Sequence, residues 1–404
     1  GGTLKLSPTR SINCDITNNT SNVNAMLDVF MNYFLDQGFK NAYNNSDPFI
    51  VRTGGGGDRV LGRLRLDETE CTSGSSKKKI TVATIVGVLA GLAPDLDVFI
   101  KSSYDPLLSL EYHRQFTHSF IFIPFGALIV TLFTYNFVKK YVTFFENYIF
   151  AFVAYSTHAL LDSCTSYGTQ LFWPFQWRVA IENIFIIDLI YTLPFLIFLI
   201  LTAFQDKLSR KRKLYNYLGL IISSTYLLAT LAFKGIAHYK ISEALEKNNI
   251  EYKDINTRAT YFNSILWSAQ IELEDYYMFT YYSLFDKSMP VFTKKFPKNH
   301  DMLQPFMNKK KIQQLIILSN GHYLITHEDD ELIFWNLKLG LKGFDENASP
   351  YIWSYVIKNN NGEIFFDEKN EKMDALKIQE RRSFRNNRNY SKEFSAFYER
   401  LKGI

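Results

Sequence analysis

Five apolar stretches between residues 80 and 234 limit what this chain can fold into. They cover about residues 80–100, 119–138, 147–164, 184–204 and 216–234. A membrane-spanning helix needs roughly 20 mostly apolar residues, and the second, fourth and fifth stretches meet that requirement cleanly. The first ends in Pro94-Asp95-Leu96-Asp97, and the third carries His158 and Asp162 in its last turns. These two stretches are either full spans or partly inserted helices.

Basic residues cluster in alternate connections between these stretches. The first stretch is preceded by Lys77, Lys78 and Lys79, and the second is separated from the third by Lys139 and Lys140. The fourth is separated from the fifth by Lys207, Arg210, Lys211, Arg212 and Lys213. The positive-inside rule places these connections in the cytoplasm. The other loops, 101–118 and 165–183, and everything after about residue 235 then face outward.

Composition excludes several classes of protein. The 45 Lys and Arg residues exceed the 40 Asp and Glu residues by only five charges, which is too small a surplus to predict nucleic-acid binding. The three cysteines, Cys14, Cys71 and Cys164, form neither a disulfide framework nor a zinc-finger spacing. Any metal must therefore be held by histidine and carboxylate side chains.

The first 76 residues are polar and are expected to be an appendage or a fusion segment. An amphipathic helix is expected at about 23–37, because its apolar residues recur at helical spacing. Gly54–Gly57 and Thr72–Ser76 are typical of flexible linkers. A membrane domain is expected to follow at 77–238.

Residues 239–404 are expected to form a soluble α+β domain on the outer side. Turn residues between apolar segments predict two hairpins, which join Ile312–Leu318 to Tyr323–Thr326 and Tyr351–Ile357 to Glu363–Phe366. Residues 265–284 are expected to add two more strands. The fold class is thus an α-helical membrane domain of about five apolar helices, with a metal site at one interface, followed by a soluble α+β domain.

Three short motifs carry residues of the metal-ligand type. His158 and Asp162 are four apart, which places both side chains on one face of a helix; the alternative is a capping Asp and a hydrogen-bonded core His. Asp95 and Asp97 follow Pro94, which disfavours helix at the residue before it. They are therefore expected at a helix break, and the alternative is a solvated outer turn.

The third motif is His113-Arg-Gln-Phe-Thr-His118. Its two histidines are five apart, so they do not share a helix face. We expect His113 in a loop and His118 in the first turn of the second span, with Thr117 capping that helix. Arg114 could bind a phosphate oxygen. The alternative is a pair of interfacial histidines.

All of these residues fall on the predicted outward side, which favours one shared metal site. The predicted ligands are Asp95, Asp97, His113, His118, His158 and Asp162. Carboxylate and imidazole without thiolate suit Zn²⁺, Mn²⁺ or Fe²⁺, with zinc preferred and more than one ion expected. Two neighbouring metals can bind a phosphoryl group and activate a water. An Asp among Asp95, Asp97 and Asp162 would then bridge the metals or act as general base, and Arg114, Gln170 and Arg178 would bind the substrate.

The same motifs resemble a known family. Ala-Pro-Asp-Leu-Asp-Val-Phe, His-Arg-Gln-Phe-Thr-His-Ser, Thr-His-Ala-Leu-Leu-Asp and Tyr-Gly-Thr-Gln-Leu-Phe-Trp-Pro-Phe are similar to motifs of the YdjM-like inner-membrane metal-dependent hydrolases. The resemblance covers about residues 78–300 and implies a relationship to the zinc-dependent phospholipase C and single-strand nuclease superfamily. It also implies a bacterial inner-membrane location and hydrolysis of a phospholipid or lipid-linked phosphate. One departure is that residues 1–76 contain no counterpart of the family's usual Asp-x-Leu-Thr-His/Gln opening.

Three functions therefore compete at this point. The leading one is a membrane-bound, metal-dependent phosphoester hydrolase whose site and C-terminal domain lie on the outer face, with the lipid bilayer as its setting and no nucleic-acid partner. The second is an ion-coupled transporter, against which the absence of a repeat and the placement of the ligands at one interface argue. The third is a non-catalytic membrane anchor with a structural metal, whose coordination positions would all be closed by protein ligands.

Overall fold

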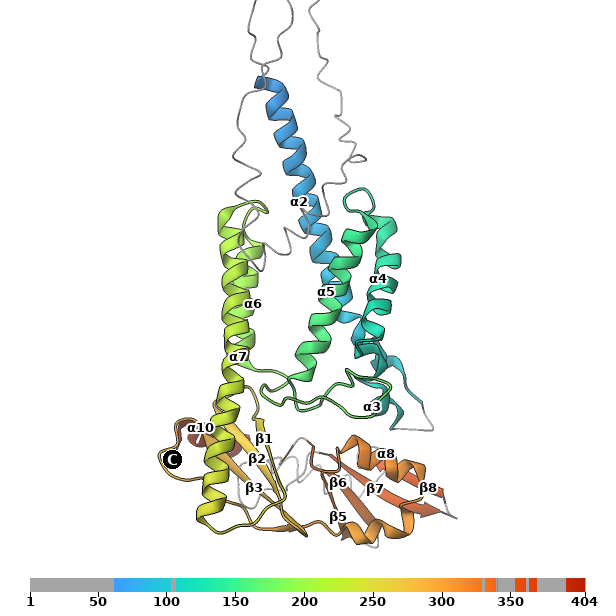
Figure 1. Cartoon of the computed structure of the whole chain (residues 1–404), viewed down its shortest axis with the longest axis vertical. Helices are drawn as coiled ribbons and strands as arrows, with labels where there is room; N and C mark the ends of the chain where they lie inside the picture. The colour runs from blue at the N-terminus through green and yellow to red at the C-terminus, as the bar shows by residue number, and fades with distance from the viewer. Residues whose placement is uncertain are drawn as a thin grey trace, which may run out of the picture.

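The computed structural model describes residues 62–102, 107–328, 331–338, 340, 353–360, 363–368 and 390–403. A helical region comes first and a sheet-containing domain follows, as the sequence predicts (Figure 1). The sheets lie at one end of the long helices. The helix expected at 23–37 and the linker expected at Gly54–Gly57 lie outside the described residues.

The helical region contains a helix in each of the five apolar stretches. Its elements are α2 (Gly62–Leu92), η1 (Pro94–Phe99), α3 (Leu108–Tyr112), η2 (Phe116–His118), α4 (Phe122–Val138), α5 (Phe144–Ser163), α6 (Leu189–Ala203) and α7 (Arg210–Lys247). By length and composition, one described helix, α7, can cross a membrane. A second candidate arises if Leu108–His118 and α4, which meet at a bend of 84°, count as one span. α6 is apolar but shorter.

The linker expected at Thr72–Ser76 is wrong, because these residues lie within α2. Once a helix has formed, each further residue adds a hydrogen bond at low cost, whereas a new helix must pay for nucleation. The strongly apolar turns between Ile80 and Leu92 therefore allow the helix to continue through the polar serines, threonine and glycine that precede them.

The helices pack in two groups, with α2, α4 and α5 in one and α6 and α7 in the other (Figure 1). Small residues allow close approach in the first group, where Ala90, Ala127 and Ala151 are fully buried. At the helix ends away from the sheets, the predicted basic connections meet. The Lys77 ammonium lies 3.1 Å from the carboxylate of Asp206, between α6 and α7.

Two antiparallel sheets of four strands form the second part of the chain. The strands follow one another in chain order within each sheet: β1 (Asp254–Ala259), β2 (Leu266–Glu272), β3 (Tyr276–Ser283) and β4 (Phe296–Pro297), then β5 (Tyr323–Glu328), β6 (Glu331–Asn336), β7 (Trp353–Asn360) and β8 (Glu363–Glu368). The first sheet packs on the last turns of α7 through Ile241 and Leu245. The described helices here are η3 (His300–Phe306), α8 (Lys310–Leu318) and α10 (Tyr390–Lys402).

Two of the strand predictions are confirmed and one is wrong. β2 and β3 lie within 265–284, and β7 pairs with β8 in a hairpin whose last paired residues are Asn360 and Glu363. Lys310–Leu318, however, is helix α8 and not the first strand of a hairpin. Its buried residues, Ile312, Leu315 and Leu318, recur every three positions, so the apolar run follows a helical period that its length alone does not reveal.

A glycine permits the contact between α4 and α5. A Cβ at Gly126 would lie 2.6 Å from the ring of Tyr155, and the Tyr155 hydroxyl donates a hydrogen bond of 3.0 Å to the carbonyl of Thr117.

We expect Gly126→Ala to destabilise the helical region by about 1–3 kcal/mol, the usual cost of overpacking. Thermal unfolding in detergent measures this. The control is Gly87→Ala, where a Cβ meets nothing within 4 Å; equal melting temperatures for the two variants would contradict the prediction.

Candidate metal centre

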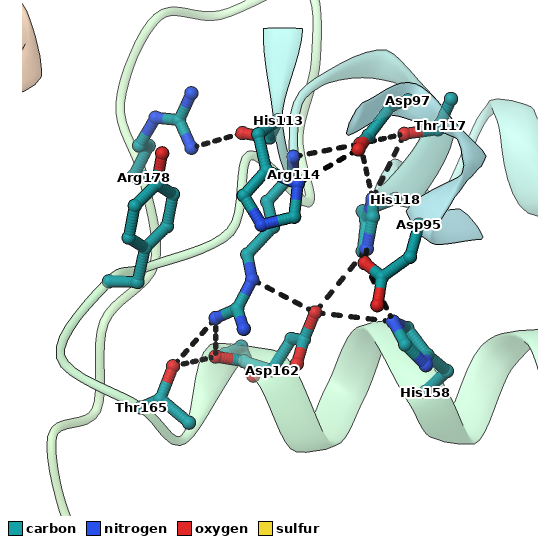
Figure 2. A network of polar contacts seen from close by, with 12 residues as sticks. Asp95, Asp97, His113, Arg114, Thr117, His118, His158, Asp162, Thr165 and Arg178 are labelled. Carbon is teal, nitrogen blue, oxygen red and sulfur yellow. Dashed lines mark hydrogen bonds and ion pairs between the residues drawn. The ribbon is translucent and has the colours of Figure 1, made fainter. Parts of the chain in front are cut away.

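Three loops and helix ends next to the sheets bring the predicted ligands together. Asp95 and Asp97 lie in η1, which follows α2 directly. His113 ends α3, and His118 ends η2 just before α4. His158 and Asp162 lie on the last turns of α5. All six side chains gather in one network (Figure 2), in two overlapping groups that share Asp95.

Four ligand atoms of this network converge on one point. The Nε2 atom of His118 lies 3.5 Å from Asp95 Oδ1 and 3.3 Å from Asp162 Oδ2. The Nε2 atom of His158 lies 3.4 Å from Asp95 Oδ1 and 3.3 Å from Asp162 Oδ2. All four atoms are buried, and none has a hydrogen-bond partner among the described residues. Buried polar atoms are rarely left unsatisfied, so this arrangement points to a bound group that all four contact.

The distances test which group fits. In a tetrahedron the edges are about 1.6 times the distance from centre to corner, so zinc bonds of about 2.0–2.1 Å give edges of about 3.3–3.4 Å. The four printed separations of 3.3–3.5 Å agree with four of the six edges of such a tetrahedron, and all four atoms lie within 4.8 Å of one another. The donor set of two imidazoles and two carboxylates suits Zn²⁺, Mn²⁺ or Fe²⁺.

Asp97 holds the surrounding loops in place. Its Oδ1 lies 2.8 Å from His113 Nδ1, and its Oδ2 accepts hydrogen bonds from the backbone N–H of Arg114 at 2.9 Å and from the hydroxyl of Thr117 at 2.8 Å. Burial alone would raise the pKa of Asp97, but its contacts with His113, His118 and Thr117 hold that pKa well below its ordinary value. Asp97 is thus an ionised, buried carboxylate.

Thr117 does not cap the helix that follows it, contrary to the sequence-based expectation. Its hydroxyl instead lies between Asp97 Oδ2 and His118 Nδ1, 2.9 Å from the latter. The hydroxyl of Ser119, not that of Thr117, accepts a hydrogen bond from the N–H of Phe122, the first residue of α4. The His118 ring, which is fully buried, is therefore oriented through its Nδ1 edge while its Nε2 atom faces the other ligand atoms. Such outer contacts fix the orientation of a metal-ligating histidine.

The second group, formed by Asp95, Asp97 and His113, differs from the first because two of its ligand atoms already contact each other. Its ligand atoms also lie within 4.8 Å of one another. However, the Asp97 and His113 atoms that would bind a metal already contact each other at 2.8 Å. The first group is therefore the better candidate for a metal, and a second ion would have to displace the contact between Asp97 and His113.

The three predicted substrate-binding residues make internal contacts. The Nε atom of Arg114 lies 3.1 Å from Asp162 Oδ2, and its Nη1 atom donates to the hydroxyl of Thr165 at 2.7 Å. Arg178 donates to the carbonyls of His113 at 2.9 Å and Glu111 at 2.8 Å. The amide of Gln170 is buried and donates to the carbonyl of Phe175.

Sequence reasoning missed two residues beside the cluster. Tyr167 stacks edge-on against His113, with ring centroids 5.3 Å apart. Lys338, from the loop after β6, places its ammonium 4.9 Å from the centroid of the same Tyr167 ring. Tyr167 begins the Tyr-Gly-Thr-Gln-Leu-Phe-Trp-Pro-Phe motif, which could have marked it, but no local signal connects Lys338 to a site in the helical region.

The fold and the cluster together define a membrane-type helical domain that carries candidate metal ligands at one end. Residues 69–237 match the family model described as YdjM inner membrane protein. The resemblance inferred from the motifs is thereby confirmed over a segment that contains all six predicted ligands. Comparison with curated proteins and with solved structures gave no match. The superfamily relationship remains a prediction.

The geometry generates a direct prediction about metal content. We expect the purified protein to bind a divalent transition metal. We expect the His118→Ala variant to lose the metal, because it lacks one of the four ligand atoms. Plasma mass spectrometry of detergent-purified protein measures the stoichiometry. The matched control is His327→Ala, an exposed histidine of β5. Full metal content in the His118→Ala variant would refute this ligand set.

Proposed function

We propose that this protein is a membrane-bound, metal-dependent hydrolase that cleaves a phosphoester, such as a phospholipid or a lipid-linked phosphate. The observation that carries the proposal is the set of four converging, buried ligand atoms that have no hydrogen-bond partner among the described residues. When bound there, a divalent metal supplies Lewis acidity and lowers the pKa of a water molecule. Arginines beside the ligands add the positive charge that a phosphoryl group requires.

The ligands differ in their access to solvent, which separates their roles. The Asp95 side chain is 44 % exposed, whereas that of Asp97 is fully buried and that of Asp162 is 15 % exposed. Asp95 is therefore the best placed of the three to accept a proton from a water that enters from solvent.

Asp162 and Asp97 serve the site differently. Asp162 is paired with Arg114, so the arginine fixes the carboxylate and offsets its charge. Asp97 contributes by orienting His118 and by holding the backbone of Arg114. Arg178 holds the loop that carries His113. These contacts preorganise the ligands, which is a condition for efficient catalysis.

One observation favours a second function, that of a membrane anchor with a structural metal. Four protein ligands are enough to close a tetrahedral shell, as in structural zinc sites. The exposed side of Asp95 favours catalysis over this alternative, because a carboxylate that reaches solvent leaves a path by which water can join the site. The activity measurement below distinguishes the two functions.

We further propose that all five long helices lie in or at the membrane, with the basic connections in the cytoplasm and the metal centre and sheets on the outer face. The helices of the first group pack around small apolar residues and a few buried polar ones, and they expose large apolar side chains. Asn147 of α5 donates to the hydroxyl of the buried Thr134 of α4 at 2.8 Å, while Phe133 and Phe137 point outward from α4. Large exposed apolar faces of this kind need a lipid or protein partner.

Activity is expected against lipid phosphoesters. We predict that the metal-loaded protein hydrolyses phospholipid in mixed micelles, that a chelator abolishes this, and that Asp162→Ala lacks it. Asp97→Asn is expected to need about 10–100 times more metal for half-maximal rate, because outer contacts tune metal affinity, while its maximal rate is preserved. Release of phosphate or phosphorylated headgroup provides the assay. Full metal content without hydrolysis of any phosphoester tested would favour the structural-metal anchor.

Topology can be tested by labelling single cysteines in a background with Cys14, Cys71 and Cys164 replaced by serine. We expect Lys101→Cys, in the loop after η1, to react with a membrane-impermeant maleimide on intact cells. Lys140→Cys, between α4 and α5, is the matched control at the opposite helix ends and should react only after lysis. Both side chains are exposed. The reverse labelling pattern would overturn the orientation.

A further inference from the structure

Three cations surround one buried tyrosine ring beside the metal ligands. The guanidinium carbons of Arg114 and Arg178 lie 5.2 Å and 5.7 Å from the centroid of the Tyr167 ring, and the Lys338 ammonium lies 4.9 Å from it. Contacts between cations and an aromatic face are favourable, but three like charges around one ring also repel one another. The arrangement therefore calls for negative charge nearby.

Among the described residues, the nearby carboxylates do not form ion pairs with all three of these cations. Asp162 pairs with Arg114. Arg178 donates to two backbone carbonyls, which carry no net charge. For Lys338, the part of the chain that the structure describes offers no carboxylate at ion-pair distance. Glu182 is the buried carboxylate that acts on Lys338, but Arg258 and Lys234 act on it as well. Asp97 and Glu111 act on Arg178 in the same way, from beyond ion-pair distance. Neither Arg178 nor Lys338 therefore has a carboxylate at ion-pair distance among the described residues.

The sheet domain holds Lys338 in this position by its backbone. The carbonyls of Leu337 and Lys338 both accept hydrogen bonds from the guanidinium of Arg258 on β1. The Lys338 N–H donates to the side chain of Asn336 at 2.9 Å. Lys338 is only 4 % exposed, so a long, charged side chain is buried at the boundary between the sheets and the helical region. Buried lysines are rare unless they have a partner or a task.

We propose that Lys338, Arg178 and Tyr167 form a binding subsite for the anionic phosphoryl group of the substrate, so that the sheet domain completes the site of the helical domain. The proposal rests on the hydrolase function proposed above and names the group that recognises its substrate. Figure 2 shows Arg114, which is held by Asp162, between Arg178 and the metal ligands.

The charge state of the lysine agrees with this role. Burial, followed by repulsion from Arg178, lowers the pKa of Lys338 to about 7. Bringing an anion beside an amine favours its charged form. A bound phosphoryl group would accept a hydrogen bond from the charged Lys338 ammonium. Such a charge-assisted hydrogen bond is stronger than a neutral one and would offset the cost of burying the charge.

Anion affinity is the direct test. Isothermal titration of the detergent-solubilised full chain would use two probes, inorganic phosphate and a short-chain phosphatidic acid below its micellar concentration. We expect Lys338→Met to weaken binding of the probes about tenfold, as for loss of one charged hydrogen bond, and Lys338→Arg to retain most of the affinity. Lys240→Met, which removes an exposed lysine paired with Glu243, is the control.

The outcomes separate the sources and the two proposals. Weaker binding of both probes by Lys338→Met supports recognition of the phosphoryl group itself, and weaker binding of only the phosphatidic acid supports recognition of that group on a lipid headgroup. Unchanged affinity for both probes, or a loss no greater than in Lys240→Met, overturns the subsite. Metal content and hydrolysis are measured on the same samples. If the protein hydrolyses lipid but Lys338→Met binds both probes normally, the hydrolase proposal stands and the subsite proposal is wrong. If the protein binds no metal but its phosphate affinity depends on Lys338, the subsite proposal stands and the hydrolase proposal is wrong.

Discussion

The buried carboxylate of Asp97 is the interaction on which the site depends. It joins η1 to the connection between α3 and α4 through His113, the N–H of Arg114 and the hydroxyl of Thr117. An unpaired carboxylate in this place would be costly, so the charge is retained only because several donors satisfy it together. Through Thr117 it sets the ring of His118, and through the Arg114 backbone it sets the arginine that meets Asp162.

Packing between α4 and α5 supports this arrangement from the side away from the sheets. The Tyr155 hydroxyl of α5 reaches the carbonyl of Thr117, and Gly126 of α4 gives the tyrosine ring its space. Asn147 of α5 donates a hydrogen bond to Thr134 of α4 between the helices, while apolar side chains cover the outside. In a bilayer, such internal hydrogen bonds and close backbone contacts replace the hydrophobic effect as the source of helix association.

Much of the site could be predicted from the sequence, because spacing and charge patterns are local. The four-residue spacing places His158 Nε2 3.3 Å from Asp162 Oδ2, and the alternating basic clusters predicted that all six ligands lie at one end of the helices. The role of Asp97 was not predictable, since its partners come from a distant loop. The helix at Lys310–Leu318 was missed because a short apolar run fits a strand or a helix equally. Lys338 carries no local signal at all, because its place beside Tyr167 depends on how Arg258 holds its loop.

The four converging ligand atoms come from three separate segments, namely η1 after α2, the end of η2 before α4, and the last turns of α5. In an unfolded chain these segments are far apart, so the free energy of metal binding becomes available only when α2, α4 and α5 have docked. The bound ion would then stabilise the association of α2, α4 and α5. Removing it from the protein and separating the helices are, on this view, a single cooperative event.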